Sequence, residues 1–282
     1  MVPPADRAYT APLDRINRAA YRRRGMLRQC STATGWLEPG EQAAVLSVFD
    51  AVRDAPILDL GVGGGRTTPL LRAISQDYCG IDYLADMVAA ARRRFPAAQF
   101  RIMDARNLRL PDAAFGLATF SYNGIASVDL PDQRLILKEV CRVLRSGGYF
   151  IFSTFNRNGM QQMPRWPDWQ IFRDAGRHPA RLLRAVAKLV VGGINQLRLR
   201  SVRRDDGEVA IGNLSAQNFA LVALFTTLTT QCRELRKAGF SVEAIFTPDG
   251  QRVSADDPIE TGAPWHHYVA RKPPAGTIAA AR

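Results

Sequence analysis

The most constraining feature of this chain is a glycine-rich turn that follows a short apolar strand, Ile57-Leu58-Asp59-Leu60-Gly61-Val62-Gly63-Gly64-Gly65. Glycine lets the backbone adopt positive φ and lets a ligand approach main-chain N–H groups without interference from a β-carbon. The third glycine of the nicotinamide fingerprint is absent because Arg66 stands there, and no lysine follows as in a phosphate-binding P-loop. Asp59 beside the turn would repel a pyrophosphate. The pattern therefore predicts a strand, turn and helix that bind a nucleoside cofactor carrying positive charge.

Two further strand-like segments end in an acid. Asp77-Tyr78-Cys79-Gly80-Ile81-Asp82 places a carboxylate 17 residues after Gly65, and Phe100-Arg101-Ile102-Met103-Asp104 places another one strand later. At this spacing an acid can accept both ribose hydroxyls of a nucleoside. Together with the turn, these segments resemble the class I S-adenosylmethionine (SAM)-dependent methyltransferases. SAM carries an ammonium and a sulfonium, which a nearby acid favours.

The resemblance implies SAM as the cofactor and S-adenosylhomocysteine (SAH) as its product. In the family, the acid after the second strand binds the ribose, and the acid after the third faces the adenine amino group. Asp82 and Asp104 occupy these positions. The cofactor-binding residues predicted in this way are Asp59, Gly61, Gly63, Gly65, Asp82, Tyr83, Met87, Asp104, Ala105 and Ser121.

The fold implied is an α/β three-layer sandwich around a Rossmann-like, seven-stranded, mostly parallel sheet whose seventh strand is antiparallel. Fourth and fifth strands are predicted over 115–124 and 148–154. A helix over 135–144 precedes the second of them, and the turn Arg145-Ser146-Gly147-Gly148 resembles the family's turn at this point. The domains expected are N-terminal helices covering the cofactor site over 1–55, a SAM-binding core over 56–156, a basic helical insertion forming a lid over 157–236, the last two strands over 237–273 and a disordered tail over 274–282.

Composition places the chain among soluble globular proteins, with 46% hydrophobic and 23% charged residues. The amino terminus lacks an apolar signal core, and no run reaches the roughly 18 apolar residues of a membrane span, so a cytoplasmic protein is expected. The four cysteines show no CxxC spacing. Neither a disulfide framework nor a metal site is therefore expected.

The net charge of +12 is concentrated after the fifth predicted strand. Residues 157–204 contain 11 basic and 2 acidic residues, which accounts for nine of the twelve charges. Within them, residues 179–191 have apolar side chains at helical spacing, with Arg181 and Arg184 on the other side. One interpretation is an amphipathic helix packed on the domain with a solvated basic face. The other is that these arginines contact an anionic partner: a substrate carboxylate, a phosphate, RNA or a membrane surface.

The acceptor is predicted to bind after strands four and five, at the edge where open α/β sheets bind ligands. Ser121-Tyr122-Asn123-Gly124 lacks the prolines of methyltransferases that act on adenine or glutamine, and no cysteine follows a proline, as methylation of cytosine C5 requires. The chain is similar here to bacterial small-molecule methyltransferases with "FSyNGID" and "FSsHN" segments, although Ala126 replaces an acid and Phe155 a histidine. The acceptor-binding residues predicted are Tyr21, Ser121, Tyr122, Asn123, Asn156, Arg181, Arg184 and Trp265.

A general base is needed only if the acceptor must lose a proton. The family's antiparallel seventh strand starts at the same edge, so His266 or His267 is the candidate base. We expect methyl transfer to an oxygen or nitrogen of a small-molecule metabolite, as in a natural-product pathway, with an acceptor that is anionic or more apolar than usual. Two alternatives stay open: a methyltransferase acting on RNA or on a membrane-associated lipid or quinone, and a SAM-binding regulatory or partner subunit without chemistry of its own.

Overall fold

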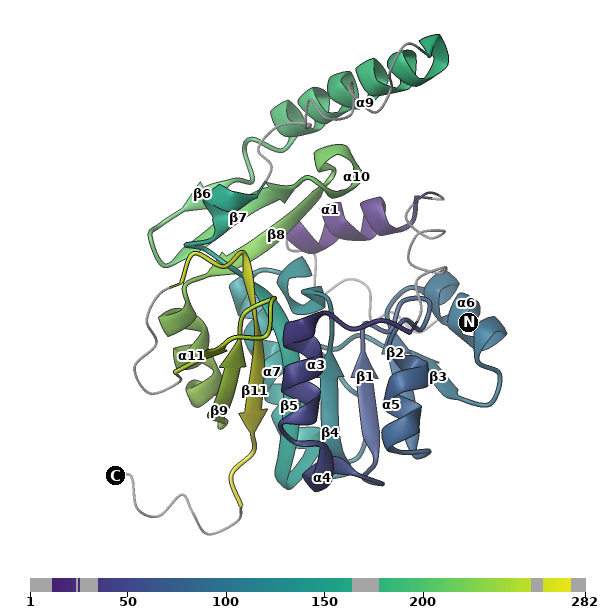
Figure 1. Ribbon diagram of the computed structural model, residues 1–282, viewed down its shortest axis with the longest axis vertical. Helices are drawn as coiled ribbons and strands as arrows, with labels where there is room; N and C mark the ends of the chain where they lie inside the picture. The colour runs from purple at the N-terminus through teal and green to yellow at the C-terminus, as the bar shows by residue number, and fades with distance from the viewer. Residues whose placement is uncertain (1–11, 24, 26–34, 164–177, 255–260, 275–282) are drawn as a thin grey trace.

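A computed structural model describes residues 12–23, 25, 35–163, 178–254 and 261–274 (Figure 1). Its centre is a sheet in the order β10-β9-β11-β5-β4-β1-β2-β3. The strands from β5 to β3 are parallel, and β11 is antiparallel to both β5 and β9. The strands of this sheet are β1 Ile57–Leu60, β2 Tyr78–Asp82, β3 Gln99–Ile102, β4 Phe115–Phe120, β5 Leu144–Asn156, β9 Ser241–Phe246, β10 Arg252–Val253 and β11 Trp265–Arg271.

Helices cover both faces of the sheet, which confirms the predicted three-layer architecture (Figure 1). Side chains alternate along each strand, so that Ile57 packs with one layer of helices and Leu58 with the other. The first layer contains α3 Pro39–Leu46, α4 Phe49–Val52, α5 Thr68–Ile74 and α6 Ala85–Arg94, and the second contains α7 Leu130–Val143 and α11 Leu228–Lys237.

The carboxyl ends of β1, β2 and β4 meet at one edge because their registers match. Asp59 lies opposite Gly80 of β2 and Thr119 of β4. The segments that follow these strands therefore converge, as they do in other open parallel sheets.

The insertion between β5 and α11 contains helices, as predicted, and also strands, which were not predicted. It holds a small antiparallel sheet whose last strand joins β5, where Phe155 pairs with Phe225. The two longer strands are six-residue runs rich in apolar residues, which favour strands when they are this short. The described elements are η3 Met160–Gln162, α9 Pro179–Arg198, β6 Arg204–Asp205, β7 Val209–Leu214, α10 Ala216–Phe219 and β8 Leu221–Thr226.

The amino-terminal helix α1 (Pro12–Tyr21) docks between this insertion and the short helix η2 (Gly124–Ser127). The Asn17 amide donates to the carbonyls of Val222 and Ser127 at 2.7 and 2.8 Å, and its oxygen accepts from the Val222 N–H at 3.0 Å. Buried amides are satisfied in this way. These bonds hold α1 next to the carboxyl edge of the sheet.

Within the part of the chain that the structure describes, no helix combines the length and apolar character needed to cross a bilayer.

Candidate functional site

The glycine turn between β1 and α5 adopts the backbone that the sequence predicts. Gly61, Gly63 and Gly65 have φ values of +61°, +54° and +86°, which residues with a side chain rarely adopt. A β-carbon at Gly61 would lie 2.5 Å from the Phe120 ring, and one at Gly65 would lie 2.6 Å from the Phe95 ring. Space as well as backbone conformation therefore requires glycine at both ends of the turn.

The Asp59 carboxylate lies beside the turn, surrounded by hydroxyl donors of the protein. Thr67 and Tyr78 each donate to one oxygen at 2.8 Å, and Thr119 donates to the other at 2.9 Å. Burial raises the pKa of Asp59, and the three hydroxyls oppose this rise. In the structure Asp59 ties β1 to β2, β4 and the turn. Its predicted pairing with the charge of the cofactor stays a prediction.

Asp82 ends β2 at the rim of the glycine turn. Its Oδ2 accepts a hydrogen bond from the Gly63 N–H at 3.0 Å, and its Oδ1 accepts one from the Leu84 N–H at 2.9 Å. Burial raises the pKa of Asp82 to about 6, although both N–H groups lower it. An ionised carboxylate has about four acceptor positions, and these two N–H groups are the donors that the described residues offer to Asp82. This geometry suits an acid that receives two ribose hydroxyls, the role predicted for it.

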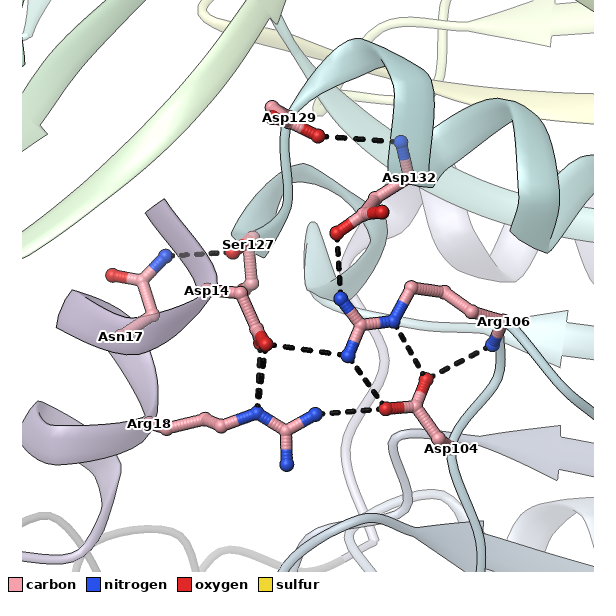
Figure 2. A network of polar contacts seen from close by, with 8 residues as sticks. All are labelled: Asp14, Asn17, Arg18, Asp104, Arg106, Ser127, Asp129 and Asp132. Carbon is pink, nitrogen blue, oxygen red and sulfur yellow. Dashed lines mark hydrogen bonds and ion pairs between the residues drawn. The ribbon is translucent and has the colours of Figure 1, made fainter. Parts of the chain in front are cut away.

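Asp104 follows β3 and is held by two arginines (Figure 2). Its Oδ1 accepts from the Arg106 main-chain N–H and Nε, both at 3.0 Å, and its Oδ2 accepts from Arg18 Nη2 at 2.7 Å and Arg106 Nη2 at 2.6 Å. Burial alone would raise the pKa of Asp104, but these donors and charges lower it. All of its acceptor positions are therefore taken. The predicted contact with an adenine amino group requires an arginine to move.

Arg106 is the centre of an ion network that joins three parts of the chain (Figure 2). Its side chain is 2% exposed, donates to Asp132 on α7 and lies 3.2 Å from Asp14 on α1, in addition to its bonds with Asp104. Arg18 completes the network by pairing with Asp14 at 2.9 Å. Buried cations are stable only when paired in this way. The network fastens α1 over the segment that follows β3.

The other residues predicted for the cofactor lie around the same edge. The Arg18 guanidinium lies over the Tyr83 ring, 4.1 Å from its centroid. Arg18 therefore covers Tyr83 and pairs with Asp104, both of which were predicted to bind the cofactor. Met87 is buried in α6, and Ala105 and Ser121 are half-buried beside the ends of β3 and β4.

An aromatic and cationic cluster, formed by Trp36, Arg66 and Tyr122, connects the glycine turn to the segment after β4. Arg66 pairs with both oxygens of Glu41 at 3.0 and 2.8 Å, and its guanidinium lies 4.6 Å from the Trp36 ring centroid and 5.5 Å from that of Tyr122. The two rings meet edge to face with centroids 5.8 Å apart. Tyr122 is 61% exposed, so this cluster presents an aromatic surface beside the turn.

Two asparagines predicted to bind the acceptor have identifiable partners in the protein. The Asn123 N–H donates to Ser153 Oγ at 2.8 Å, which joins the ends of β4 and β5. Asn156 is buried, and its amide donates to the carbonyls of Thr261 and Ala263 at 2.8 and 2.9 Å. Asn156 thus holds the segment before β11, and its contact with an acceptor stays a prediction.

The candidate base residues lie on β11, which begins at the predicted edge. His266 is fully buried with Nε2 2.7 Å from Thr261 Oγ1, and burial lowers its pKa to about 4. His267 is 2% exposed, with Nε2 3.3 Å from a Glu38 oxygen that also accepts from the Trp265 indole N–H at 2.9 Å. Neither imidazole is open to an acceptor in this conformation. The role of either histidine as a base stays a prediction.

Tyr21 and the two arginines predicted to bind the acceptor lie on α1 and α9. Tyr21 is half-buried against η2, with its hydroxyl 3.4 Å from Ser127 Oγ. Arg181 and Arg184 are exposed in the first turns of α9, which extends away from the parallel sheet (Figure 1). Residues 164–177 of the insertion lie outside the described part of the chain, and the role of the insertion as a lid stays a prediction.

A cavity of about 1030 Å³ opens at the foot of α9, beside β7. None of the predicted acceptor residues is among its described lining residues. Its walls combine apolar side chains with arginines and polar groups, among them Met160, Ile211, Phe225, Arg203 and Arg204.

Comparison with known proteins agrees with this geometry. Residues 57–148 match the family model of a methyltransferase domain. A probable S-adenosylmethionine-dependent methyltransferase of Mycolicibacterium smegmatis is 35% identical over 101 residues, which make up 36% of this chain and 38% of that protein. The chain carries a class I SAM-dependent methyltransferase domain. SAM is the cofactor of this class, and the glycine turn with Asp82 is the part of the domain that suits it best.

A further relative and a solved structure show how much of the chain these similarities cover. A demethylmenaquinone methyltransferase of Paenarthrobacter aurescens is 30% identical over 112 residues, 40% of this chain and 43% of that protein. The chain thus spans less than half the length of these curated relatives. The structure of 1,6-didemethyltoxoflavin-N1-methyltransferase of Burkholderia thailandensis, with 1,6-didemethyltoxoflavin and SAH bound, matches with a TM-score of 0.55 at 16% identity over 97% of this chain and 93% of that one. At this identity the likeness shows the fold alone.

Sequence reasoning missed three arginines of the site: Arg18, Arg106 and Arg66. The spacing of Asp14 and Arg18, four residues apart on a helix, is the one available signal. Arg66 was noted only as the residue that replaces a glycine. The other carboxylates that these arginines contact lie 25 to 92 residues from them along the chain. The exception is Asp104, which is two residues from Arg106.

Proposed function

We propose that this protein transfers a methyl group from SAM to an oxygen or nitrogen atom of a small-molecule acceptor at the carboxyl edge of β1, β4 and β5. The observation that carries the proposal is the Asp82 carboxylate. It lies at the glycine turn, is held in place by the N–H groups of Gly63 and Leu84 and, among the described residues, uses about half of its four acceptor positions. The family of the domain supports the same function.

The residues at the turn fit the nucleoside part of SAM. Asp82 would accept the ribose hydroxyls, and the turn from Gly61 to Gly65 leaves main-chain groups uncovered by β-carbons. When bound, SAM supplies a methyl group that its sulfonium already activates. Asp104 would contact the adenine only after Arg18 or Arg106 had released one of its oxygens.

The protein's contribution to such a reaction is mainly to position the acceptor. Holding two reactants in line can account for about 7–11 kcal/mol of a barrier at most. His266 is unprotonated at neutral pH because its pKa is about 4, but its ring is buried, as is that of His267. An acceptor with a free lone pair, such as an amine, would react at this edge without a base. A hydroxyl acceptor would require one of the histidines to become accessible.

A second candidate is an acceptor that resides in a membrane, such as a lipid or a quinone. The cavity at the foot of α9 has apolar walls formed by Met160, Ile211 and Phe225. One of the relatives is named as acting on demethylmenaquinone, which supports an acceptor of this kind. RNA is less favoured, because α9 exposes aliphatic side chains beside its cations.

The proposal is tested first by calorimetric titration of SAH into the wild type and the Asp82→Ala variant. We expect the variant to lose about 1.5–3 kcal/mol of binding free energy, the scale of hydrogen bonds to a charged group. Asp86→Ala, which removes an exposed acid from the first turn of α6, is the matched control and should bind as the wild type does. Equal affinity in all three proteins would remove Asp82 from the ribose site.

The chemistry is tested by transfer of a labelled methyl group from SAM to aqueous metabolite extracts and, in parallel, to lipid extracts. Label in the aqueous products supports a small-molecule acceptor, and label in the lipid products supports the second candidate. A protein that binds SAH but labels neither would instead be a SAM-binding partner subunit.

A further inference from the structure

We propose that helix α9 docks this protein on the surface of an anionic phospholipid bilayer. The helix has 20 residues and extends away from the parallel sheet (Figure 1). It joins the rest of the protein through α10, where the Asn195 amide donates to the Asn218 carbonyl at 2.9 Å. Because α9 contains none of the residues of the glycine turn, docking through α9 does not depend on the proposed methyl transfer.

The apolar side chains of α9 face solvent. Leu183 and Leu197 are 71% and 67% exposed, although apolar stripes on the helices of globular proteins normally face the core. The exposed residues fall on one side of the helix because most of them are spaced three, four or seven apart. The set is Leu182, Leu183, Val186, Val190, Val191, Ile194 and Leu197.

The buried side of α9 has small or polar residues instead. Ala185, Gly192 and Asn195 are its buried positions. The contact with the protein therefore uses the side of the helix that is poorest in apolar surface. Contiguous exposed apolar patches of this kind mark contacts with proteins or membranes.

The charge of α9 selects between these partners. The helix contains four cations and no acid: Arg181, Arg184, Lys188 and Arg198. Among the described residues, no carboxylate lies within ion-pair distance of any of them. A helix with apolar side chains on one side and cations on the other is typical of helices that lie in the interface of an anionic membrane.

A second copy of the chain fits this surface less well. A symmetric dimer through α9 would place side by side two helices that each carry four cations and no acid, because a two-fold interface pairs a surface patch with itself. Like charges placed opposite one another in an interface oppose association. Lipid phosphates, in contrast, neutralise the cations while the acyl region receives the apolar side chains.

The experiment is co-flotation of the full-length protein with vesicles of phosphatidylcholine alone or of phosphatidylcholine mixed with phosphatidylglycerol. We expect binding to the mixed vesicles that weakens as salt is added, and little binding to phosphatidylcholine. Replacing Lys188 and Arg198 by Gln should weaken binding to the mixed vesicles about fivefold for each cation removed. Failure of the wild type to float with mixed vesicles would overturn the proposal.

The apolar contribution is tested with the double variant Leu183→Glu, Leu197→Glu. We expect it to lose more than about tenfold in vesicle binding while it still binds SAH, which shows that the domain is folded. The matched control is Leu46→Glu, which places a charge at another exposed leucine (61%) on α3 and should float as the wild type does. Equal flotation of the double variant and the wild type would also overturn the proposal.

Light scattering distinguishes the remaining occupant. A wild type that forms dimers, does not float and becomes monomeric in the Leu183→Glu, Leu197→Glu variant would assign the surface to a second copy. Because SAH binding is measured separately, failure of vesicle docking and failure of the proposed methyl transfer are distinguishable.

Discussion

The carboxyl edge of the parallel sheet and helix α9 both concentrate charge, but they differ in how that charge is compensated. At the sheet edge, Arg18 and Arg106 lie within 3.2 Å of carboxylates from α1, α7 and the segment after β3. On α9, within the described structure, Arg181, Arg184 and Lys188 have no such partner. Charge at the edge fastens the protein's own elements together, whereas the charge of α9 is available to a partner outside the chain.

The apolar residues of the two regions differ in the same sense. In α11, which covers the sheet, Leu228, Cys232 and Leu235 are fully buried against the strands. In α9, residues with similar spacing are exposed. Periodicity alone therefore indicates an apolar side of a helix but does not indicate what covers it.

The largest expected effect is a difference in stability between variants of α11 and α9. Leu235→Ala should lower the free energy of unfolding by about 2–5 kcal/mol, because it removes buried apolar contacts and leaves a cavity. Leu183→Ala should change it by less than about 0.5 kcal/mol, because that side chain is 71% exposed. Urea denaturation of both variants measures the difference. A large loss in Leu183→Ala would mean that α9 packs on the protein in solution.

The next effect is the pH dependence of cofactor binding at the sheet edge. Ribose hydroxyls donate to the ionised form of Asp82, whose pKa is raised to about 6 by burial. Affinity for SAH should therefore be constant above about pH 6 and fall about tenfold for each pH unit below it. Calorimetry across this range measures the change, and Asp82→Asn should bind weakly with no such dependence.

The same pKa has the opposite effect on the stability of the free protein. Between about pH 6 and pH 4 the folded state retains a proton on Asp82 that the unfolded state has lost. Lowering the pH through this window therefore increases the contribution of Asp82 to the free energy of unfolding. The Asp82→Asn variant lacks this contribution to the pH profile. A wild-type SAH affinity that stays constant down to pH 4.5, about 1.5 units below the pKa, would contradict an ionised Asp82 in the complex.

The smallest effect concerns Arg18, which pairs with Asp104 and covers the Tyr83 ring. Arg18→Ala frees an acceptor position on Asp104, so SAH should bind about fivefold more tightly, corresponding to about 1 kcal/mol for one hydrogen bond. Arg15→Ala, at an exposed position of the same helix, is the control and should leave affinity unchanged. Weaker binding in Arg18→Ala would show that Arg18 belongs to the cofactor site and does not compete with the cofactor.

Local patterns were sufficient to predict much of the sheet edge. The glycine turn and Asp82 follow strands whose apolar residues are consecutive in sequence, and they lie where the spacing placed them. Arg18 could not be assigned in the same way, because its partner Asp104 is 86 residues away. The histidines were placed on the correct strand, but their burial depends on the helices and loops that pack over β11.

The amino-acid sequence by itself determined the order of strands and helices around the turn, the glycines with positive φ and the apolar side of α9, since these follow from backbone sterics and from the periods of strands and helices. Only the tertiary structure decided which charges are paired and which side of α9 faces solvent. Ion pairs and burial depend on segments far apart in the chain, and folding brings those segments together through the packing of the sheet and its helices.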